Sequence, residues 1–231
     1  FCRALAGRCE VIIAVARRAQ RLQALATELE GQVEVHVVQA DLGTVEGVAR
    51  TLEALRQKGP VDILVNNAGF ATLGQFPELP IGSQRDMLAL HCDATISLCR
   101  GAIPFMRERG GGSIINVSSL GAFLPGKGLT VYGATKAFLN YFSQALQAEV
   151  EPDGIRVQAL CPGYVRSEFH EAFIREGFDP GRIPEQMWSE ASDVVAASLA
   201  ALDDGGVIVV PGEANQSLAR AGVEGQLSLL S

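Results

Sequence analysis

The sequence predicts an α/β protein: a doubly wound parallel sheet with helices on both faces, forming a three-layer α/β/α sandwich in a single domain over residues 1–231. Short runs rich in β-branched residues alternate with longer segments of helical period, which is typical of stacked βαβ units. A chain of 231 residues with 48% hydrophobic side chains can bury one large core. Its 25 glycines and 10 prolines are scattered, so they mark no boundary between domains.

Six strands and six helices are expected in alternation. Short apolar runs predict strands over residues 10–16, 33–40, 61–65, 113–117, 155–160 and 206–210. Apolar residues at helical spacing predict helices over residues 19–29, 44–58, 83–109, 131–150, 167–177 and 192–202. Because a helical segment separates each strand from the next, the strands should run parallel.

Charge and composition argue against several kinds of partner. With 19 basic and 26 acidic residues the net charge is −7, so nucleic acid is not an expected partner. The longest wholly apolar stretches, such as residues 11–16, are far shorter than a bilayer span, so no membrane association is expected. The five cysteines include no Cys-x-x-Cys pair, and no histidine cluster has metal-ligand spacing. We therefore expect a soluble cytoplasmic protein without a metal site.

The strongest local feature is Tyr132, followed four residues later by Lys136 and preceded by Ser119 at the end of an apolar strand. Positions four apart share one helix face, so the Lys136 ammonium can lie beneath the Tyr132 hydroxyl. A cation and the positive end of a helix both lower the pKa of a phenol, which would let Tyr132 exchange a proton with an alcohol or a carbonyl. The Ser119 hydroxyl can hydrogen-bond the same substrate oxygen.

A tyrosine and a lysine four apart also occur by chance on exposed helix faces, but here they belong to an ordered set of motifs. The set is Asn66-Asn67-Ala68-Gly69 after one strand, Ser118-Ser119 after the next, Tyr132 with Lys136, and then Pro162-Gly163-Tyr164-Val165-Arg166-Ser167. It resembles the N-N-A-G, S-x12-Y-x-x-x-K and P-G-x-V-x-T elements of the short-chain dehydrogenase/reductase family. The resemblance covers nearly the whole chain and implies a Rossmann-like NAD(P)-dependent oxidoreductase.

The resemblance also implies a role for each matching residue. Tyr132 is then the catalytic acid/base and Ser119 orients the substrate oxygen, while Lys136 lowers the pKa of Tyr132 and binds the nicotinamide ribose. Val165 and Ser167 would hold the nicotinamide carboxamide. The other implied cofactor-binding positions are Pro162, Gly163, Asn67, Ala68 and Gly69. The last three form a turn of small residues that lets a cofactor approach the backbone, although a plain tight turn has the same composition.

The residues after the first predicted strand favour NADP over NAD. An acidic residue near this strand end accepts from the ribose 2′-hydroxyl in NAD enzymes, whereas arginine accommodates a 2′-phosphate. Ala16 occupies the acidic place and Arg17 follows it, with no carboxylate expected nearby. Arg17 and Arg18 can instead begin the next helix at the surface, which is the preferred interpretation for Arg18. Asp41 and Leu42 match the family's adenine-side position, and Asp41 can also cap the helix that follows.

The sequence departs from the family pattern at His91, where the family commonly has an asparagine that holds a water in a proton relay to the lysine. Imidazole can bond a water through one nitrogen and a backbone carbonyl through the other, so His91 is a candidate catalytic residue. A histidine between Leu90 and Cys92 can equally be a core residue. We expect a His91→Asn exchange to keep or raise activity.

The second departure is at the start of the sequence. Residues 1–7 have the pattern of a helix tail, and neither a first strand nor a Gly-rich turn precedes them. A strand with such a turn takes roughly 12 to 15 residues, and we expect about that much of the natural chain to be missing. Without the donor-rich helix N-terminus that binds pyrophosphate, the sequence as it stands is expected to bind NADP poorly.

Substrate specificity is expected from residues 70–82, 121–130 and 168–187. The last segment mixes apolar and charged residues, as in a mobile lid over an apolar ketone, aldehyde or alcohol, or in a packed surface helix. The leading function is an oxidoreductase in which Tyr132 transfers the proton. The alternatives are a nucleotide-binding regulatory relative with weak or no turnover, and a structural module, which leaves the motif order unexplained. The family resemblance also implies a homodimer or homotetramer packed through the long helices that start near Ser83 and Val131.

Overall fold

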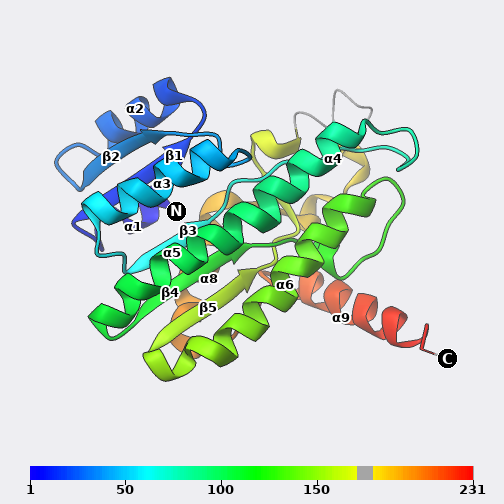
Figure 1. Cartoon of the computed structure of the whole chain (residues 1–231). Helices are drawn as coiled ribbons and strands as arrows, with labels where there is room; N and C mark the ends of the chain where they lie inside the picture. The colour runs from blue at the N-terminus through cyan, green and yellow to red at the C-terminus, as the bar shows by residue number, and fades with distance from the viewer. Residues whose placement is uncertain (171–178, 231) are drawn as a thin grey trace.

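The computed structural model describes residues 1–170 and 179–230, and these contain all six predicted strands (Figure 1). Each lies within two residues of its predicted ends, and two short strands were not predicted. The strands are β1 (Val11–Ala16), β2 (Glu34–Gln39), β3 (Ile63–Asn66), β4 (Gly112–Val117), β5 (Ile155–Leu160), β6 (Tyr164–Arg166), β7 (Trp188–Glu190) and β8 (Ile208–Val209).

The predicted helices over 19–29, 44–58, 131–150 and 192–202 are confirmed, and the predicted helix 83–109 is confirmed as one helical run with a π-helical turn inside it. The predicted helix 167–177 falls mostly on residues 171–178, outside the described residues. The described α-helices are α1 (Cys2–Leu5), α2 (Ala19–Glu28), α3 (Val45–Lys58), α4 (Ile81–Leu88), α5 (Ala94–Arg109), α6 (Thr130–Val150), α8 (Ala191–Asp204) and α9 (Glu213–Leu227). The π turn η1 (Ala89–Asp93) joins α4 to α5, and the 3-10 turns are η2 (Leu120–Ala122), η3 (Glu151–Asp153), η4 (Glu168–His170), η5 (Pro180–Arg182) and η6 (Glu185–Met187).

Every strand pairing is parallel, as predicted. β1 pairs with β2, while β3, β4, β5 and β8 form a four-stranded sheet in that order, and β6 pairs with β7. In the larger sheet Ile63 lies opposite Ser113, and Gly112 lies opposite Ile155. Within the described residues, β1 and β3 each have a partner on one edge alone. The expectation of a further strand upstream of residue 1 stays a prediction.

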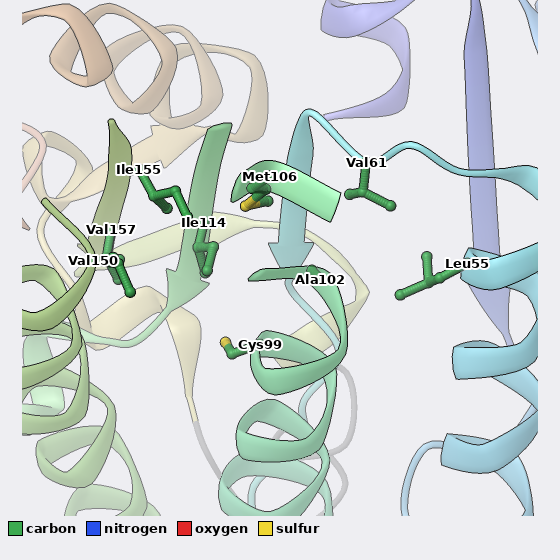
Figure 2. Packing of buried hydrophobic residues seen from close by; sticks show 9 residues of the cluster. All are labelled: Leu55, Val61, Cys99, Ala102, Met106, Ile114, Val150, Ile155 and Val157. Carbon is green, nitrogen blue, oxygen red and sulfur yellow. The ribbon is translucent and has the colours of Figure 1, made fainter. Parts of the chain in front are cut away.

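Alternating side chains on β4 join the two helical layers to the sheet. Ile114 packs with Met106 of α5 and with Val150 at the end of α6, and Figure 2 shows this cluster between the strands and α5. Ile115, on the opposite face, packs with Leu199 of α8 and with α1. Helices α3, α5 and α6 therefore cover one face and α1 and α8 the other, which confirms the three-layer α/β/α fold (Figure 1).

Two features that the sequence did not predict lie near the carboxyl end of the chain. β6 and β7 are three residues each, too short for a periodic pattern, and their pairing places Tyr164 against Trp188 with ring centroids 5.4 Å apart. Helix α9 begins after Gly212, which has a φ of 86° and provides no side-chain cap, so the usual signal of a helix start is missing.

The described residues show neither a membrane-spanning helix nor a metal-binding cluster. None of the helices described is long and apolar enough to cross a membrane. In the same part of the chain, no three His, Cys, Asp or Glu side chains are grouped so that they can hold a metal ion. All five cysteines have free thiols.

Candidate active site

The predicted site residues follow the carboxyl ends of the parallel strands. Arg17 follows β1, Asp41 follows β2 and residues 67–69 follow β3, while Ser119 comes after β4 and Pro162 after β5. Ligands of doubly wound sheets bind outside the carboxyl ends of the strands. The topology therefore gives the predicted cofactor-binding and catalytic residues a common edge of the fold.

The η2 turn brings Ser119 to Tyr132. Ser119 Oγ accepts a hydrogen bond from the Gly121 amide at 3.0 Å, and the Ser119 side chain acts to lower the pKa of the Tyr132 hydroxyl. A methyl group at Gly121 would lie 3.4 Å from Ser119 Oγ and 3.5 Å from Cε1 of Tyr132. Gly121, which has no side chain, therefore lies against both of these residues, which belong to separate motifs.

Tyr132 and Lys136 share one buried face of α6, as predicted, and are 9% and 5% exposed. Lys136 Nζ lies 5.6 Å from the centroid of the Tyr132 ring and donates a hydrogen bond to the Val117 carbonyl at 2.8 Å. Ser118 Oγ donates to the backbone carbonyl of Lys136, also at 2.8 Å. These two hydrogen bonds attach the first turns of α6 to the end of β4.

The protonation of Tyr132 differs from the expectation. Burial raises the pKa of Tyr132 above its ordinary value, because the phenolate would lose its hydration, and the hydrogen bond with Ser119 offsets this only in part. The Lys136 amine instead donates to the Val117 carbonyl. Burial therefore dominates the pKa of Tyr132 in the chain without cofactor, where Tyr132 is a neutral phenol at neutral pH, and the role of Lys136 in lowering this pKa stays a prediction.

Burial affects Lys136 in the opposite direction. Loss of hydration disfavours the ammonium and lowers the pKa of Lys136 to about 8, although the nearby thiols of Cys161 and Cys92 act weakly against this shift. Lys136 therefore changes its protonation close to physiological pH.

His91 lies in the π turn η1 and is 1% exposed. Its Nε2 accepts a hydrogen bond from the Phe70 amide at 3.2 Å, and its Nδ1 lies 2.9 Å from Thr135 Oγ1. Burial, assisted by the charge of Lys136, lowers the pKa of His91 to about 3, so the ring is neutral. The expected pairing of the ring with a water and a backbone carbonyl is wrong, because both nitrogens bond other protein groups.

The Asn66 side chain is internal, whereas the turn after it faces outward. Asn66 Nδ2 donates to Asn116 Oδ1 at 2.8 Å, and Asn116 Nδ2 donates to Ser143 Oγ of α6 at 2.9 Å. Residues 67–69 are exposed. The buried amides thus anchor the turn, and its exposed residues are accessible to a ligand.

Arg17 has a carboxylate neighbour that the sequence did not predict. The Arg17 side chain is 73% exposed, and its Nη1 lies 3.9 Å from Asp41 Oδ2, so the expectation of no carboxylate nearby is wrong. Asp41 Oδ1 accepts from the Gly43 amide at 3.0 Å. Helix α3 is capped by Thr44, whose hydroxyl accepts from the Gly47 amide, so Asp41 is not its cap.

Arg18 occupies the N-cap position of α2, which confirms its predicted place at the start of this helix. Its guanidinium lies 3.1 Å from a carboxylate oxygen of Glu168, which also bonds Arg21. Leu42, beside Asp41, is half-buried. The ion pairs at Glu168 connect α2 with the segment after β6.

The segment after β5 is attached to η2. The Pro162 carbonyl accepts from the Leu120 amide at 2.8 Å. Further along, Val165 is half-buried in β6 and Ser167 is exposed. The hydrogen bond at Pro162 therefore places the start of this predicted cofactor segment beside the turn that holds Ser119.

Apolar side chains surround Tyr132. The cluster joins elements that are distant in sequence, and the Phe169 ring centroid lies 6.1 Å from that of Tyr132. Its members besides Tyr132 are Phe70, Ala71, Leu73, Met87, Leu129, Val131 and Phe169. All three segments expected to border the substrate contribute to this cluster, although residues 171–178 of the third lie outside the described residues.

Sequence reasoning missed Thr135, Gly121 and Asn215. Thr135 lies three residues after Tyr132 and donates to its carbonyl at 2.8 Å, a common role for a helical threonine, but no sequence pattern pairs Thr135 with His91. Asn215 of α9 lies against Gly163, where a methyl group would be 2.5 Å from Asn215 Oδ1. A contact between such distant segments has no local sequence signal.

Comparison with known proteins agrees with this geometry. The family described as short chain dehydrogenase matches residues 1–176. A serine 3-dehydrogenase of Rhizobium radiobacter is 36% identical over 168 residues, which are 72% of this chain and 66% of that protein. The chain thus spans just under two thirds of that relative's length. A sulfoacetaldehyde reductase of Chromohalobacter salexigens is 33% identical over 73% of this chain and 67% of its own length.

Solved structures give the same family. A short-chain dehydrogenase from Sphingobium yanoikuyae in complex with NADPH is 32% identical with a TM-score of 0.84, covering 100% of this chain and 90% of that one. A bulky-bulky ketone specific alcohol dehydrogenase from Comamonas testosteroni is 29% identical with a TM-score of 0.80, covering 100% and 88%. The chain belongs to the short-chain dehydrogenase family of oxidoreductases.

The buried Lys136 predicts how stability varies with pH. Its pKa is about 8 in the folded chain and 10.5 ordinarily, so between these values the unfolded chain holds a proton that the folded chain has released. Stability therefore rises with pH across this interval, and the full penalty for burying the ammonium applies below it. We compare the free energy of unfolding of the wild type with that of Lys136→Met. The difference, wild type minus variant, should rise by about 3 kcal/mol as the pH increases from about 8 to 10.5.

Urea unfolding of both proteins, without cofactor and at a series of pH values, measures this difference. Lys127→Met, at an exposed lysine, is the matched control. A difference between the wild type and Lys136→Met that stays constant with pH would contradict the lowered pKa of Lys136.

Proposed function

We propose that this protein is an NADP-dependent oxidoreductase that acts on a carbonyl or alcohol substrate, with Tyr132 as its general acid/base. One observation carries the proposal: Tyr132 shares a buried helix face with Lys136, and Gly121 lies against both Ser119 Oγ and the Tyr132 ring. A hydroxyl pair beside a buried amine can bind a substrate oxygen and exchange a proton with it. The family membership of the chain supports this chemistry.

In carbonyl reduction, Tyr132 donates its proton to the substrate oxygen and the Ser119 hydroxyl donates a hydrogen bond to that same oxygen. The raised pKa of Tyr132 keeps the phenol protonated, so the proton donor is in its active form at neutral pH. Alcohol oxidation needs the phenolate as a base, and burial disfavours that form. Without cofactor, the site therefore holds Tyr132 in the protonation state that carbonyl reduction uses.

The described residues fit the two ribose groups and the carboxamide of a nicotinamide dinucleotide. Arg17 has an exposed guanidinium just beyond β1, and residues 67–69 form an exposed turn just beyond β3. Arg17 would hold the 2′-phosphate, Lys136 the nicotinamide ribose, and Val165 with Ser167 the carboxamide. When bound, the nicotinamide supplies or accepts the hydride. A relative solved with NADPH supports this choice.

The apolar surroundings of Tyr132 favour an apolar carbonyl substrate. Phe70, Leu73, Leu129 and Phe169 all pack against the buried cluster that contains Tyr132, and the Phe169 ring lies beside the Tyr132 ring. Apolar walls bind a hydrophobic ketone or aldehyde by excluding water from both surfaces. The similarity to a ketone-specific alcohol dehydrogenase supports this substrate class over the polar substrates named for other relatives.

Replacement of Tyr132 separates an enzyme from a regulatory binder. We expect Tyr132→Phe to lower kcat for an apolar ketone about 10²- to 10⁴-fold, the usual contribution of a general acid. NADPH affinity, measured by fluorescence, should remain that of the wild type. Tyr141→Phe is the matched control, because Tyr141 lies on the same helix and is 77% exposed. Wild-type turnover in Tyr132→Phe would refute the assigned role, and a wild type that binds NADPH but reduces no carbonyl would favour the regulatory relative.

Cofactor choice depends on Arg17 and is opposed by Asp41, whose carboxylate repels a phosphate. We expect kcat/KM to be higher with NADPH than with NADH. Arg17→Ala should reduce that preference about 10- to 100-fold, which corresponds to the loss of one hydrogen bond to a charged group. Arg18→Ala is the control, since Arg18 pairs with Glu168. A wild type that prefers NADH would contradict the assignment of NADP.

A homodimer or homotetramer is also expected. Leu88, Ile96 and Tyr141, on α4, α5 and α6, are 47%, 41% and 77% exposed, and large apolar side chains on adjacent helices are typical of protein interfaces. Light scattering should give at least twice the chain mass for the wild type and a smaller mass for Tyr141→Glu. A monomeric wild type would contradict this expectation. The free cysteines fit a reducing compartment such as the cytoplasm.

A further inference from the structure

The contacts of His91 determine which of its ring nitrogens carries the proton. Nε2 faces the Phe70 amide at 3.2 Å, and a backbone amide can only donate, so Nε2 must be the acceptor. A neutral imidazole then carries its proton on Nδ1, which lies 2.9 Å from Thr135 Oγ1. The Thr135 hydroxyl accepts a hydrogen bond from Nδ1–H and donates one to the Tyr132 carbonyl at 2.8 Å. Every donor in this series of hydrogen bonds, from the Phe70 amide to the Thr135 hydroxyl, therefore has an acceptor.

This hydrogen-bonded chain joins two parts of the candidate site. At one end, the Phe70 amide directly follows the turn of residues 67–69 proposed to bind the cofactor. At the other end, Thr135 lies on α6 between Tyr132 and Lys136. The fit is close, since a methyl group at Gly69 would lie only 2.9 Å from His91 Nε2 and 3.6 Å from Lys136 Nζ. Movement of the imidazole would therefore disturb the turn and α6 together.

We propose that His91 is a positioning residue, held as the neutral Nδ1–H tautomer, that couples the turn 67–70 to the helix carrying Tyr132 through Thr135. The inference rests on the proposed function for its kinetic consequences, but the tautomer and its contacts do not. Both ring nitrogens are used within the protein, so His91 has no free position with which to bond a relay water.

The π turn η1 explains how the side chain reaches both partners. A π turn inserts one residue into a helix, and such turns often occur at functional sites. The His91 ring is flanked by the rings of Phe70 and Tyr132, with both centroid distances 6.1 Å. An asparagine side chain is shorter than imidazole, so His91→Asn should lose at least one of the contacts with the Phe70 amide and the Thr135 hydroxyl. On this proposal His91→Asn lowers activity, which differs from the expectation drawn from the family pattern.

Nitrogen-15 NMR of histidine-labelled protein tests the tautomer without any need for turnover. His91 is assigned as the signal lost in His91→Asn. We expect a protonated Nδ1, an unprotonated Nε2, and shifts that stay constant between about pH 5.5 and 8, a range in which exposed imidazoles titrate. A protonated Nε2, or a His91 signal that titrates in this range, would overturn the proposal even if the protein is an active enzyme.

Exchange of Thr135 tests the coupling. Thr135→Val keeps the side-chain shape but removes the acceptor of Nδ1–H, whereas Thr135→Ser keeps the hydroxyl and is the matched control. We expect Thr135→Val to lower kcat and raise KM for NADPH, each about tenfold, and Thr135→Ser to restore both to near the wild-type values. Circular dichroism and thermal unfolding establish that the variants are folded.

The outcomes separate this proposal from the proposed function. Wild-type kcat and KM in a folded Thr135→Val variant would overturn the coupling while leaving the role of Tyr132 intact. If the wild type reduces no carbonyl, the proposed function fails, and the coupling is then judged by NADPH affinity, which Thr135→Val should lower and Thr135→Ser should not. If Thr135→Val does not fold, the tautomer and its pH independence in the wild type decide the question.

Discussion

The candidate site depends on the removal of Tyr132 and Lys136 from water at the point where α6 meets the end of β4. Two hydrogen bonds hold this junction, from Lys136 to the Val117 carbonyl and from Ser118 to the Lys136 carbonyl. Dehydration destabilises both charged forms, so the phenol stays protonated and the pKa of the amine falls to about 8. Burial of Tyr132 and the hydrogen bond from the Gly121 amide to Ser119 restrict these two side chains, which is what orientation of a substrate oxygen requires.

The surrounding elements support this junction from several directions. The Asn66, Asn116 and Ser143 side chains connect β3, β4 and α6 inside the core, so the strand ends and the helix keep their relative positions. The His91 and Thr135 contacts connect α6 with the exposed turn after β3. A shift of α6 would therefore change the proton donor and the proposed cofactor turn at the same time.

The sequence was sufficient for features that repeat or that lie close together along the chain. Strand and helix periodicity predicted the layers, and the spacing of Tyr132 and Lys136 predicted their shared face. Properties set by distant contacts were not predictable: the proximity of Asp41 to Arg17, the partners of His91, and the direction of the pKa change at Tyr132 all depend on burial and on neighbours from other elements. The strands β6 and β7 were missed because three residues show no period.

Titration of Tyr132 in the protein without cofactor tests the central claim most directly. The phenolate absorbance of the wild type and of Tyr132→Phe is followed from neutral to alkaline pH. The difference between the two proteins gives the ionisation of the Tyr132 hydroxyl alone. If burial dominates, the Tyr132 phenolate forms only above the ordinary tyrosine pKa of about 10. A phenolate that forms near neutral pH would show that the Lys136 charge outweighs dehydration, and would contradict the account of Tyr132 as a protonated donor.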